Sequence, residues 1–414
     1  MHMAMTSAEK ILARASGKDK VSPGDIVQPN PELVIMHDGY VNMAYEQLSQ
    51  LGYRRITAPE KVMIITDHKV LHLTSEAILD AKNHRHVAEK WGVRYFFGAG
   101  QAGHGHIYPM EVGLVKPGMF LFSYDMHCTN FGAVGAYAHR AGPDIITVLA
   151  TGSLWVTVPA TIRIELTGQF AFGAHPRDLG FWLSSQLSPE RLDIDFDYRV
   201  VEFSGHAVDE MPLSSRVALC NTLTEIGVAN VLFPSQQLTG GWQTQISDED
   251  AHFENKITLD IGEVSPQVVL PGAPDQGVSI DEVVGLKIDH AFIGACGSGM
   301  YDDFRIAADI LKNKKIAPHV RMFVVPGTVA VAKQLSDSGL SNIFADAGAI
   351  QLPPGCGLCA GGLGGPLAPN EVSISTAATN GAGRMGAKDA KCYLGSPITV
   401  ARSAIEGCIT DPRT

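Results

Sequence analysis

Four short apolar runs, spread along most of the chain, constrain its fold more than any other feature of the sequence. They occupy residues 62–66, 119–123, 290–294 and 320–325. Continuous apolar runs of this length are typical of strands in a parallel sheet, because such strands are buried on both faces. A helical pattern over residues 301–315 alternates with them, so the sequence predicts an α/β fold.

Two helices can be located from the residues at their ends. Thr6 and Glu9 form a capping-box pattern, which predicts an N-terminal helix that ends near Gly17. Residues 301–315 carry two aspartates in the first turn and three lysines in the last, charges that complement the ends of a helix dipole.

Polar residues follow three of the apolar runs at the point where each run ends. Asp67 and His68 follow the first, Asp125 and His127 follow the second, and Cys296 follows the third. In open parallel sheets, ligands bind beyond the carboxyl ends of the strands. We therefore expect a functional site built from these side chains.

Proline-rich connections indicate where the chain divides. They occur near Pro159 and over residues 271–274. At about 150 residues per domain, a chain of 414 residues has room for two or three domains. We expect three domains, at residues 1–160, 161–285 and 286–414.

The chain is acidic, with 43 Asp and Glu against 32 Lys and Arg and a formal net charge of −11. This balance argues against nucleic acid as a partner, because nucleic-acid binders concentrate basic residues on one face. No apolar run reaches the roughly 20 residues that a membrane-spanning helix needs, and the N-terminus lacks a secretory signal. We expect a cytoplasmic protein that binds neither nucleic acid nor a membrane.

Seven cysteines, an odd number, are spread thinly over this long chain. They are Cys128, Cys220, Cys296, Cys356, Cys359, Cys392 and Cys408. Without a secretory signal, thiols or metal ligands are expected rather than disulfides. Cys356 and Cys359 form a CxxC in a loop rich in glycine and proline, which by itself fits a redox dithiol or half of a zinc site. There is no second CxxC and no thioredoxin-like setting around it, which weakens both interpretations.

Cys296 is a candidate third ligand, because it stands just before a predicted helix, where the dipole favours a thiolate. Three cysteines would hold a four-iron cluster with one iron free of protein ligands, whereas electron-transfer clusters use four. Such an open iron can act as a Lewis acid on a substrate hydroxyl and carboxylate. Cys128, beside His127, could instead supply a fourth ligand. The other three cysteines are expected to be packed thiols.

The order of these motifs along essentially the whole chain resembles one family: the large subunit of 3-isopropylmalate dehydratase and its aconitase-superfamily relatives, including homoaconitase. The motifs that carry the resemblance are His37-Asp38-Gly39, Asp67-His68, His106-x-x-Pro109-x-Glu111, Asp125-x-His127, Asn221-x-x-x-Glu225, Gly294-Ala295-Cys296, Gly355-Cys356-Gly357-x-Cys359 and Gly383-Arg384-x-Gly386.

The resemblance implies three aconitase-like α/β domains around a [4Fe-4S] cluster held by Cys296, Cys356 and Cys359, with [2Fe-2S] as the alternative. It also implies a hydro-lyase that reversibly dehydrates a hydroxy-dicarboxylate such as 3-isopropylmalate or a related 2-alkylmalate. The family's fourth, swivel domain carries a serine base and a carboxylate-binding arginine. This chain ends at Thr414, where the third domain is expected to finish. We therefore expect the swivel domain on a separate small subunit.

The resemblance also assigns catalytic roles. Eliminating water needs an acid to protonate the departing hydroxyl, and His68, oriented by Asp67, resembles that acid. Two further carboxylate–histidine pairs resemble groups that set imidazole protonation near the reacting oxygen. These pairs are His106 with Asp125 and His127 with Glu225.

Five residues resemble substrate-binding positions of the family. Arg384 matches a carboxylate-binding arginine, whose planar fork suits bidentate contact. Asn221 matches a hydrogen-bond donor near the cluster, and His37 matches a substrate-facing polar position. Ser298 and Thr379 fall in loops where the family places its other substrate contacts.

The sequence differs from the family mainly at positions where the family binds its substrate. The family usually has Ser-Cys-Thr-Asn-Gly-Arg around the first cysteine, whereas this chain reads Ala-Cys-Gly-Ser-Gly-Met over residues 295–300. Met126 replaces a usual serine, and Thr379 replaces an arginine that forms a second carboxylate clamp. A charge-assisted contact of that kind contributes roughly 1.5–3 kcal/mol. We therefore expect a hydroxyacid less highly charged than citrate, or one with an apolar distal group.

Three other functions stay open at this point. The first is a divergent hydro-lyase with a [2Fe-2S] or mononuclear metal centre that acts on a different hydroxyacid. The second is a non-catalytic cluster-binding redox or sensor protein, which would need a fourth ligand such as Cys128. The third is an RNA-binding regulator of the same superfamily, which the acidic balance and the missing fourth domain disfavour.

Overall fold

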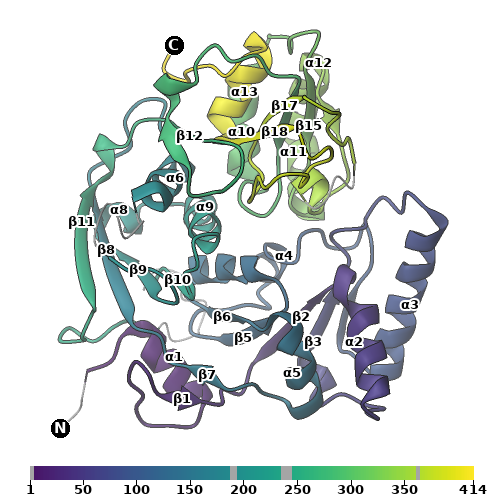
Figure 1. The fold of residues 1–414 in the computed structure, drawn as a ribbon, viewed down its shortest axis with the longest axis vertical. Coiled ribbons are helices and arrows are strands. Elements are labelled where there is room, and N and C mark those ends of the chain that lie inside the picture. The colour runs from purple at the N-terminus through teal and green to yellow at the C-terminus, as the bar shows by residue number, and fades with distance from the viewer. Residues whose placement is uncertain (1–3, 187–193, 235–244, 360–363) are drawn as a thin grey trace. The chain divides into compact units, whose positions relative to one another are not determined.

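The computed structural model describes residues 4–186, 194–234, 245–359 and 364–414. In this part of the chain two compact units can be distinguished (Figure 1). Unit 1 comprises Met1–Leu166, Phe196–Glu210 and Gly227–Leu259. Unit 2 comprises Thr167–Asp195, Met211–Ile226 and Asp260–Thr414. The three domain boundaries expected from the sequence stay a prediction.

Unit 1 is built around a parallel sheet with the strand order β4-β3-β2-β5-β6. Its strands are β2 (Leu33–His37), β3 (Val62–Ile65), β4 (Tyr95–Phe97), β5 (Phe120–Ser123) and β6 (Tyr137–Arg140). Every residue of β2, β3 and β5 is buried, as continuous apolar strands require. The strands predicted at residues 62–66 and 119–123 are confirmed as β3 and β5.

Helices cover this sheet and complete its core. They are α1 (Ser7–Ala15), α2 (Asp38–Gln50), α3 (Ser75–Trp91) and α5 (Ile145–Thr151). Each buries an apolar face in one cluster with the side chains of the strands. The short strands β1 (Ile26–Val27) and β7 (Val156–Thr157) form an antiparallel pair.

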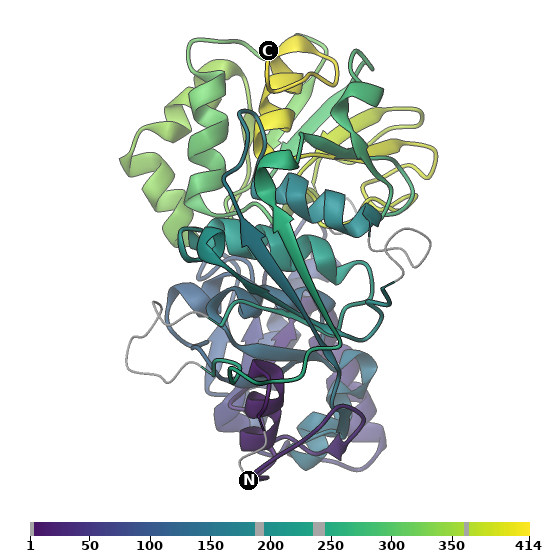
Figure 2. The same cartoon turned by 90° about the vertical axis from the view of Figure 1, so that its left-hand side faces the viewer.

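A second sheet of unit 1 has the strand order β10-β9-β8-β11. Its strands are β8 (Thr161–Thr167), β9 (Val200–Ser204), β10 (Asn230–Leu232) and β11 (Asn255–Asp260). The first three run parallel, and β8 and β11 lie side by side in the middle of Figure 2. Half-buried and exposed residues alternate along β11, which suits an edge strand with one solvated face.

Unit 2 is built around a sheet with the strand order β13-β12-β18-β17-β14-β15-β16. Its strands are β12 (Gln267–Val269), β13 (Gly277–Ser279), β14 (His290–Ile293), β15 (Arg321–Val324), β16 (Ile350–Gln351), β17 (Val372–Ser375) and β18 (Lys391–Leu394). Strands β14 to β18 run parallel, and β12 and β13 are antiparallel additions. The strands predicted at residues 290–294 and 320–325 are confirmed as β14 and β15.

The helices of unit 2 fall into two groups. The sheet packs with α10 (Tyr301–Leu311), α11 (Val329–Asp337), α12 (Leu340–Ala347) and α13 (Pro397–Glu406) in one apolar cluster. Helices α6 (Pro176–Gln186) and α9 (Leu213–Thr224) pack against each other, and α6 also contacts β12 and β13.

The sequence correctly predicted the N-terminal cap of α1 but placed the C-terminal end of α10 too late. The capping box of α1 is present, since Thr6 Oγ1 accepts from the Glu9 amide at 3.3 Å and the Glu9 carboxylate accepts from the Thr6 amide at 2.6 Å. Helix α10 begins as predicted, but it ends at Leu311 instead of residue 315. Asn313 adopts a φ of 60°, and a left-handed residue cannot continue a right-handed helix.

Among the described helices, none combines the length and the apolar character that crossing a bilayer requires. Both units consist of mostly parallel sheets with packed helices, so the predicted α/β class is confirmed.

Candidate active site

The carboxyl edge of the β4-β3-β2-β5-β6 sheet gathers histidines and carboxylates from four strand ends. They are His37 and Asp38 at the end of β2, Asp67 and His68 after β3, His104 and His106 after β4, and Asp125 and His127 after β5. These strands are parallel, so the segments that leave them start from one edge of the sheet. We call this group the histidine edge.

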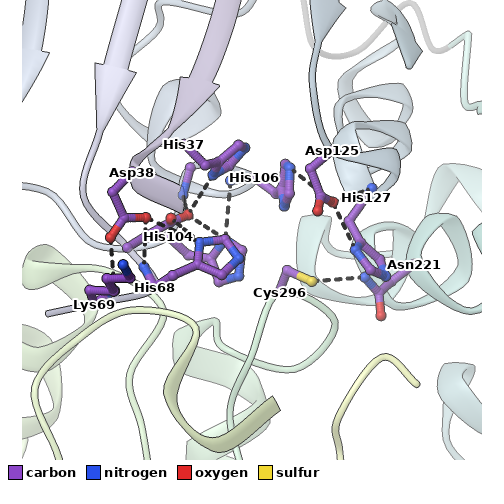
Figure 3. Close-up of polar contacts among 12 residues, drawn as sticks. His37, Asp38, His68, Lys69, His104, His106, Asp125, His127, Asn221 and Cys296 are labelled. Atoms are coloured by element: carbon purple, nitrogen blue, oxygen red, sulfur yellow. Dashed lines mark hydrogen bonds and ion pairs between the residues drawn. The ribbon is translucent and has the colours of Figure 1, made fainter. Parts of the chain in front are cut away.

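Asp67 is the centre of the histidine edge, whose histidines are labelled in Figure 3. Its carboxylate is fully buried and accepts hydrogen bonds from His37 Nδ1 at 2.9 Å and His68 Nδ1 at 2.6 Å. The amide of Gly105 donates to the same carboxylate at 2.8 Å. A Cβ at residue 105 would lie 2.5 Å from the His37 ring, so glycine is what allows this loop to approach so closely.

Charges within this group fix its protonation. Burial alone would raise the pKa of Asp67, but the charges and hydrogen bonds of His37 and His68 outweigh it and hold that pKa well below its ordinary value. Burial alone would lower the pKa of His68, but Asp67 and Asp38 outweigh it and raise that pKa well above its ordinary value. His68 is therefore an imidazolium beside an ionised carboxylate at neutral pH.

Asp38 supports His68 from a second side. One of its carboxylate oxygens lies 3.4 Å from His68 Nδ1 and accepts from the His68 amide at 3.2 Å. The other accepts from the Lys69 amide at 2.8 Å. Two carboxylates thus hold the imidazolium in one orientation.

His104 and His106 are neutral members of the histidine edge. Burial lowers the pKa of His104 to about 4 and lowers the pKa of His106 well below its ordinary value. His104 Nδ1 accepts from the His106 amide at 3.3 Å. Within the described residues, no hydrogen-bond partner reaches His104 Nε2 or either ring nitrogen of His106. Because Nδ1 of the neutral His104 ring accepts, its Nε2 carries the proton and can donate to a bound molecule, and the His106 ring offers one donor and one acceptor.

Asp125 and His127 form a second carboxylate–imidazole pair. His127 Nδ1 lies 3.0 Å from Asp125 Oδ1, which also accepts from the His127 amide at 2.9 Å. His106 Nε2 lies 3.7 Å from the same oxygen, which is beyond hydrogen-bonding distance. Burial alone would raise the pKa of Asp125, but His127 outweighs it and the pKa is held well below its ordinary value. The closer partner of Asp125 is therefore His127. The proposed pairing of His127 with Glu225 joins different units and stays a prediction.

Cys128, the alternative fourth cluster ligand, is enclosed within unit 1. Its side chain is fully buried, and its sulfur lies 3.6 Å from the Ala138 carbonyl, to which the thiol donates. Burial raises the pKa of this thiol well above its ordinary value, which disfavours the thiolate that a metal binds. Its surroundings are those of a packed thiol.

The carboxyl edge of the unit 2 sheet carries the three predicted cluster ligands. Cys296 follows β14, and Cys356 and Cys359 follow β16. None of the three forms a disulfide, all are at most 4% exposed, and they belong to one cluster of buried side chains. Ala295 adopts a φ of 61° just before Cys296. This conformation costs a non-glycine residue about 1–2 kcal/mol and recurs at functional sites. We call the three cysteines the cysteine edge.

Two polar side chains of unit 2 contact the cysteine edge. Asn221, in α9, donates from Nδ2 to Cys296 Sγ at 3.1 Å (Figure 3). Arg384 Nε donates to the Cys359 carbonyl at 2.7 Å. Burial alone would lower the pKa of Arg384, but the negative charges of Cys359 and Cys356 outweigh it and raise that pKa. A permanent positive charge therefore lies beside these thiols.

Ser298 and Thr379, the other two predicted substrate contacts, also lie near strand ends of unit 2. Ser298 is fully buried, and its hydroxyl has no hydrogen-bond partner among the described residues. Thr379 follows β17 and is half-buried. Their contact with a substrate stays a prediction.

The residues of the cysteine edge fit an iron–sulfur cluster. Three buried thiols are a soft donor set of the kind that such clusters select. Donors from Asn221 and Arg384 suit the negative charge of thiolate ligands. The unpaired Ser298 hydroxyl leaves one more polar group for a bound molecule.

Sequence reasoning missed Asp38 and His104 as members of the histidine edge. Asp38 was visible as the residue directly after His37, and His104 as the first half of a His-x-His pattern beyond β4. Both would have been found if the polar residues after every strand had been considered, instead of those after three strands.

Comparisons with known proteins agree with this arrangement. A sequence profile of the aconitase family (aconitate hydratase) matches residues 9–287 and 281–407. The 3-isopropylmalate dehydratase large subunit 1 of Methanopyrus kandleri is 36% identical over 421 aligned residues, which cover 99% of each chain. The probable methanogen homoaconitase large subunit of Methanothermobacter thermautotrophicus is 34% identical over 423 aligned residues, which cover 99% of this chain and 98% of that one.

A solved structure, the holo form of aconitase X from Thermococcus kodakaraensis, has a TM-score of 0.50 and 12% identity, and the match covers 91% of this chain and 93% of that one. At this identity the likeness concerns the fold alone.

Proposed function

Because the chain belongs to the aconitase family, we propose that it reversibly dehydrates a hydroxy-dicarboxylate such as 3-isopropylmalate or a related 2-alkylmalate. It is a hydro-lyase large subunit. The observation that carries the proposal is the imidazolium of His68, which two carboxylates hold in a buried site.

His68 is the acid of this proposal. Dehydration breaks a carbon–oxygen bond, and the departing hydroxyl leaves as water only if it receives a proton. The raised pKa of His68 keeps that proton available at neutral pH. After the transfer, the neutral imidazole keeps its hydrogen bond to Asp67, which therefore holds the ring in place for the reverse reaction.

The neutral imidazoles of the histidine edge orient the substrate. His106 and His104 have unpaired ring nitrogens in the described chain, and their lowered pKa values keep them uncharged. A neutral ring can donate one hydrogen bond to a substrate oxygen without competing with His68 for the proton. The Asp125–His127 pair supplies a further fixed imidazole.

Cys296, Cys356 and Cys359 would hold a [4Fe-4S] cluster, and Asn221 would donate to the first of these ligands. A cluster with three protein ligands supplies a Lewis acid, namely one iron without a cysteine. Arg384 would bind a substrate carboxylate through the guanidinium nitrogens that its Cys359 contact does not use.

The substrate class follows from what this site lacks. The resemblance places Thr379 and Met300 where the family usually carries arginines, so we expect no second carboxylate clamp at these two positions. An apolar group on the substrate needs no such clamp. We therefore favour an alkyl-substituted malate over citrate.

The relatives are named large subunits, and we propose a separate small subunit that carries the swivel domain. This small subunit would supply the base that removes the carbon-bound proton. None of the seven cysteines forms a disulfide, which fits our expectation of a cytoplasmic protein.

The test compares substrates on the cluster-loaded chain, purified together with its small subunit under anaerobic conditions. Appearance of the alkene product is followed with 3-isopropylmalate, with other 2-alkylmalates and with citrate. We expect kcat/KM to be highest for an alkylmalate, with turnover in the ordinary range of about 1–10³ s⁻¹. A preference for citrate would contradict the substrate class, and no turnover of any hydroxyacid would contradict the proposed function.

A further inference from the structure

Arg177 is a fully buried arginine that the proposed reaction does not use. It is the second residue of α6, and none of its side chain is exposed. Nη2 donates to the Ala377 carbonyl at 2.5 Å, and the guanidinium carbon lies 5.1 Å from the centre of the Phe181 ring. Within the described residues, no hydrogen-bond partner reaches Nε or Nη1. A buried cation with unmade hydrogen bonds destabilises a fold unless something compensates it.

Nearby carboxylates compensate this charge only in part. Asp178 accepts from the amides of His175 at 2.8 Å and Gln267 at 3.1 Å, and Asp303 accepts from the Met300 amide at 3.0 Å. Burial raises the pKa of Asp178 and of Asp303 to about 7. Each carboxyl group is therefore harder to ionise than an exposed one, and each already accepts from backbone amides.

Nη1 of Arg177 lies against the loop of the first cysteine. A Cβ at residue 297 would lie 2.3 Å from Arg177 Nη1 and 2.2 Å from Asn221 Oδ1. Gly297 directly follows Cys296, whose sulfur accepts from Asn221. The guanidinium thus occupies space beside the cysteine that only a glycine at residue 297 leaves open.

We propose that Arg177 is a positioning residue of the cysteine edge, whose charge and free N–H groups compensate the negative charge of the thiolate ligands and of the cluster they hold. The inference rests on the proposed function only in taking these cysteines as cluster ligands. Burial lowers the pKa of Arg177 to about 10, although nearby acidic groups act to raise it. The guanidinium is therefore charged at neutral pH.

This role has consequences that a purely structural arginine would not have. Without a cluster the cation is under-compensated, so Arg177→Met, which keeps an unbranched side chain, should leave the apo protein as stable or more stable. With a cluster the cation favours the reduced form, which carries one more negative charge. Its removal should therefore make reduction harder.

The experiment measures two quantities on the full chain: the midpoint potential of the cluster reconstituted with iron and sulfide, by an EPR-monitored redox titration, and the melting temperature with and without the cluster. The variants are Arg177→Met, Arg177→Lys, and Arg321→Met as a control. Arg321 is an arginine of the same unit that pairs with Glu371, so it matches the change in net charge.

For Arg177→Met we expect the ratio of reduced to oxidised cluster at a fixed potential to fall about tenfold, which is about 59 mV for one electron. The apo melting temperature should not fall. Arg177→Lys should restore most of the potential, and Arg321→Met should leave it unchanged.

An unchanged potential in Arg177→Met would overturn the proposal. So would an apo melting temperature several degrees lower, because Arg177 would then be a structural support for the Ala377 carbonyl. If the only change in Arg177→Met is a higher KM, the guanidinium binds the substrate and does not compensate the charge of the cluster. If the parent chain takes up no cluster, the proposed function fails, and the apo melting temperature alone decides the role of Arg177.

Discussion

The histidine edge of unit 1 and the cysteine edge of unit 2 use the same fold principle but satisfy their polar groups differently. Both lie at the carboxyl ends of parallel strands. On the histidine edge, Asp67 and Asp125 bind imidazoles and backbone amides at 2.6 to 3.0 Å. Beside the cysteine edge, Nε and Nη1 of the Arg177 cation and the Ser298 hydroxyl lack partners in the described chain, whereas on the histidine edge the unpartnered atoms include ring nitrogens of His37, His104 and His106.

The two edges therefore differ in whether their charged groups are compensated within the described chain. The histidine edge already contains the carboxylates that set the charge of its imidazoles, so its proton chemistry is fixed by the fold. The cysteine edge carries positive charge and unmade hydrogen bonds, as a site does when it is shaped for an anionic bound group. Unit 1 is thus suited to proton transfer and unit 2 to holding a cofactor and a substrate carboxylate.

Replacing one of the proposed ligands of the cysteine edge should have the largest effect on activity. Cys296→Ser removes one of the three proposed cluster ligands, so we expect iron, sulfide and activity to be lost together. Iron and sulfide counts and a turnover assay measure this. Cys408→Ser, a half-buried thiol beside Thr410 in the same unit, should change neither. Full iron content in Cys296→Ser would show that another residue is the third ligand.

Replacing the acid of the histidine edge should leave the cysteine edge intact. His68→Ala removes the proposed proton donor, and we expect turnover to slow by about 10²–10⁴ with unchanged iron content. The exposed His319 of unit 2 provides the control, since His319→Ala deletes an imidazole that bonds to the Gly407 carbonyl. If His68→Ala lost iron together with activity, His68 would be needed for the cluster, and the two edges would not have separate roles.

Arg384 tests whether the cysteine edge also binds substrate. Arg384→Ala removes a charged contact of roughly 1.5–3 kcal/mol, so kcat/KM should fall about 10- to 100-fold. Steady-state kinetics on protein of measured iron content separate this effect from cluster loss. Arg305→Ala, on an exposed face of α10, should have no effect. A variant with normal kcat/KM would remove Arg384 from the substrate site.

The smallest effect concerns pH. Asp67 raises the pKa of His68, so Asp67→Asn should lower it and move the alkaline limb of the pH–rate profile to lower pH. The raised pKa of His68 also makes the free energy of unfolding depend on pH. Its stabilising contribution is fully present below the ordinary pKa of about 6.5 and is lost as pH rises through the raised value. Asp67→Asn should therefore destabilise the fold most on the acid side of that window. An unshifted alkaline limb would mean that Asp67 does not control the acid.

Much of this arrangement could be predicted from the sequence. The apolar runs located four central strands because they are buried on both faces, and the residues after them led to Asp67, His68, Asp125 and Cys296. The edge strands were harder to see: β16 has two exposed residues, and β13 is only half-buried. Neither carries a continuous apolar signal.

Arg177 could not be predicted, because its role depends on packing between distant segments. Nothing near it in sequence indicates that α6 brings its side chain beside Gly297 and Ala377. The hydrogen-bonding of the histidine edge was predicted only in part. His68 with Asp67 follows from adjacency, whereas the buried His37–Asp67 bond joins residues thirty positions apart.

The most direct test of the account is an EPR spectrum of the reconstituted, reduced chain, recorded with and without 3-isopropylmalate. We predict close to four irons per chain and a spectrum that changes when the hydroxyacid is added, because one iron has no protein ligand and can bind it. A two-iron centre, or a four-iron spectrum that no hydroxydicarboxylate alters, would contradict the claim that the cysteine edge holds a catalytic cluster.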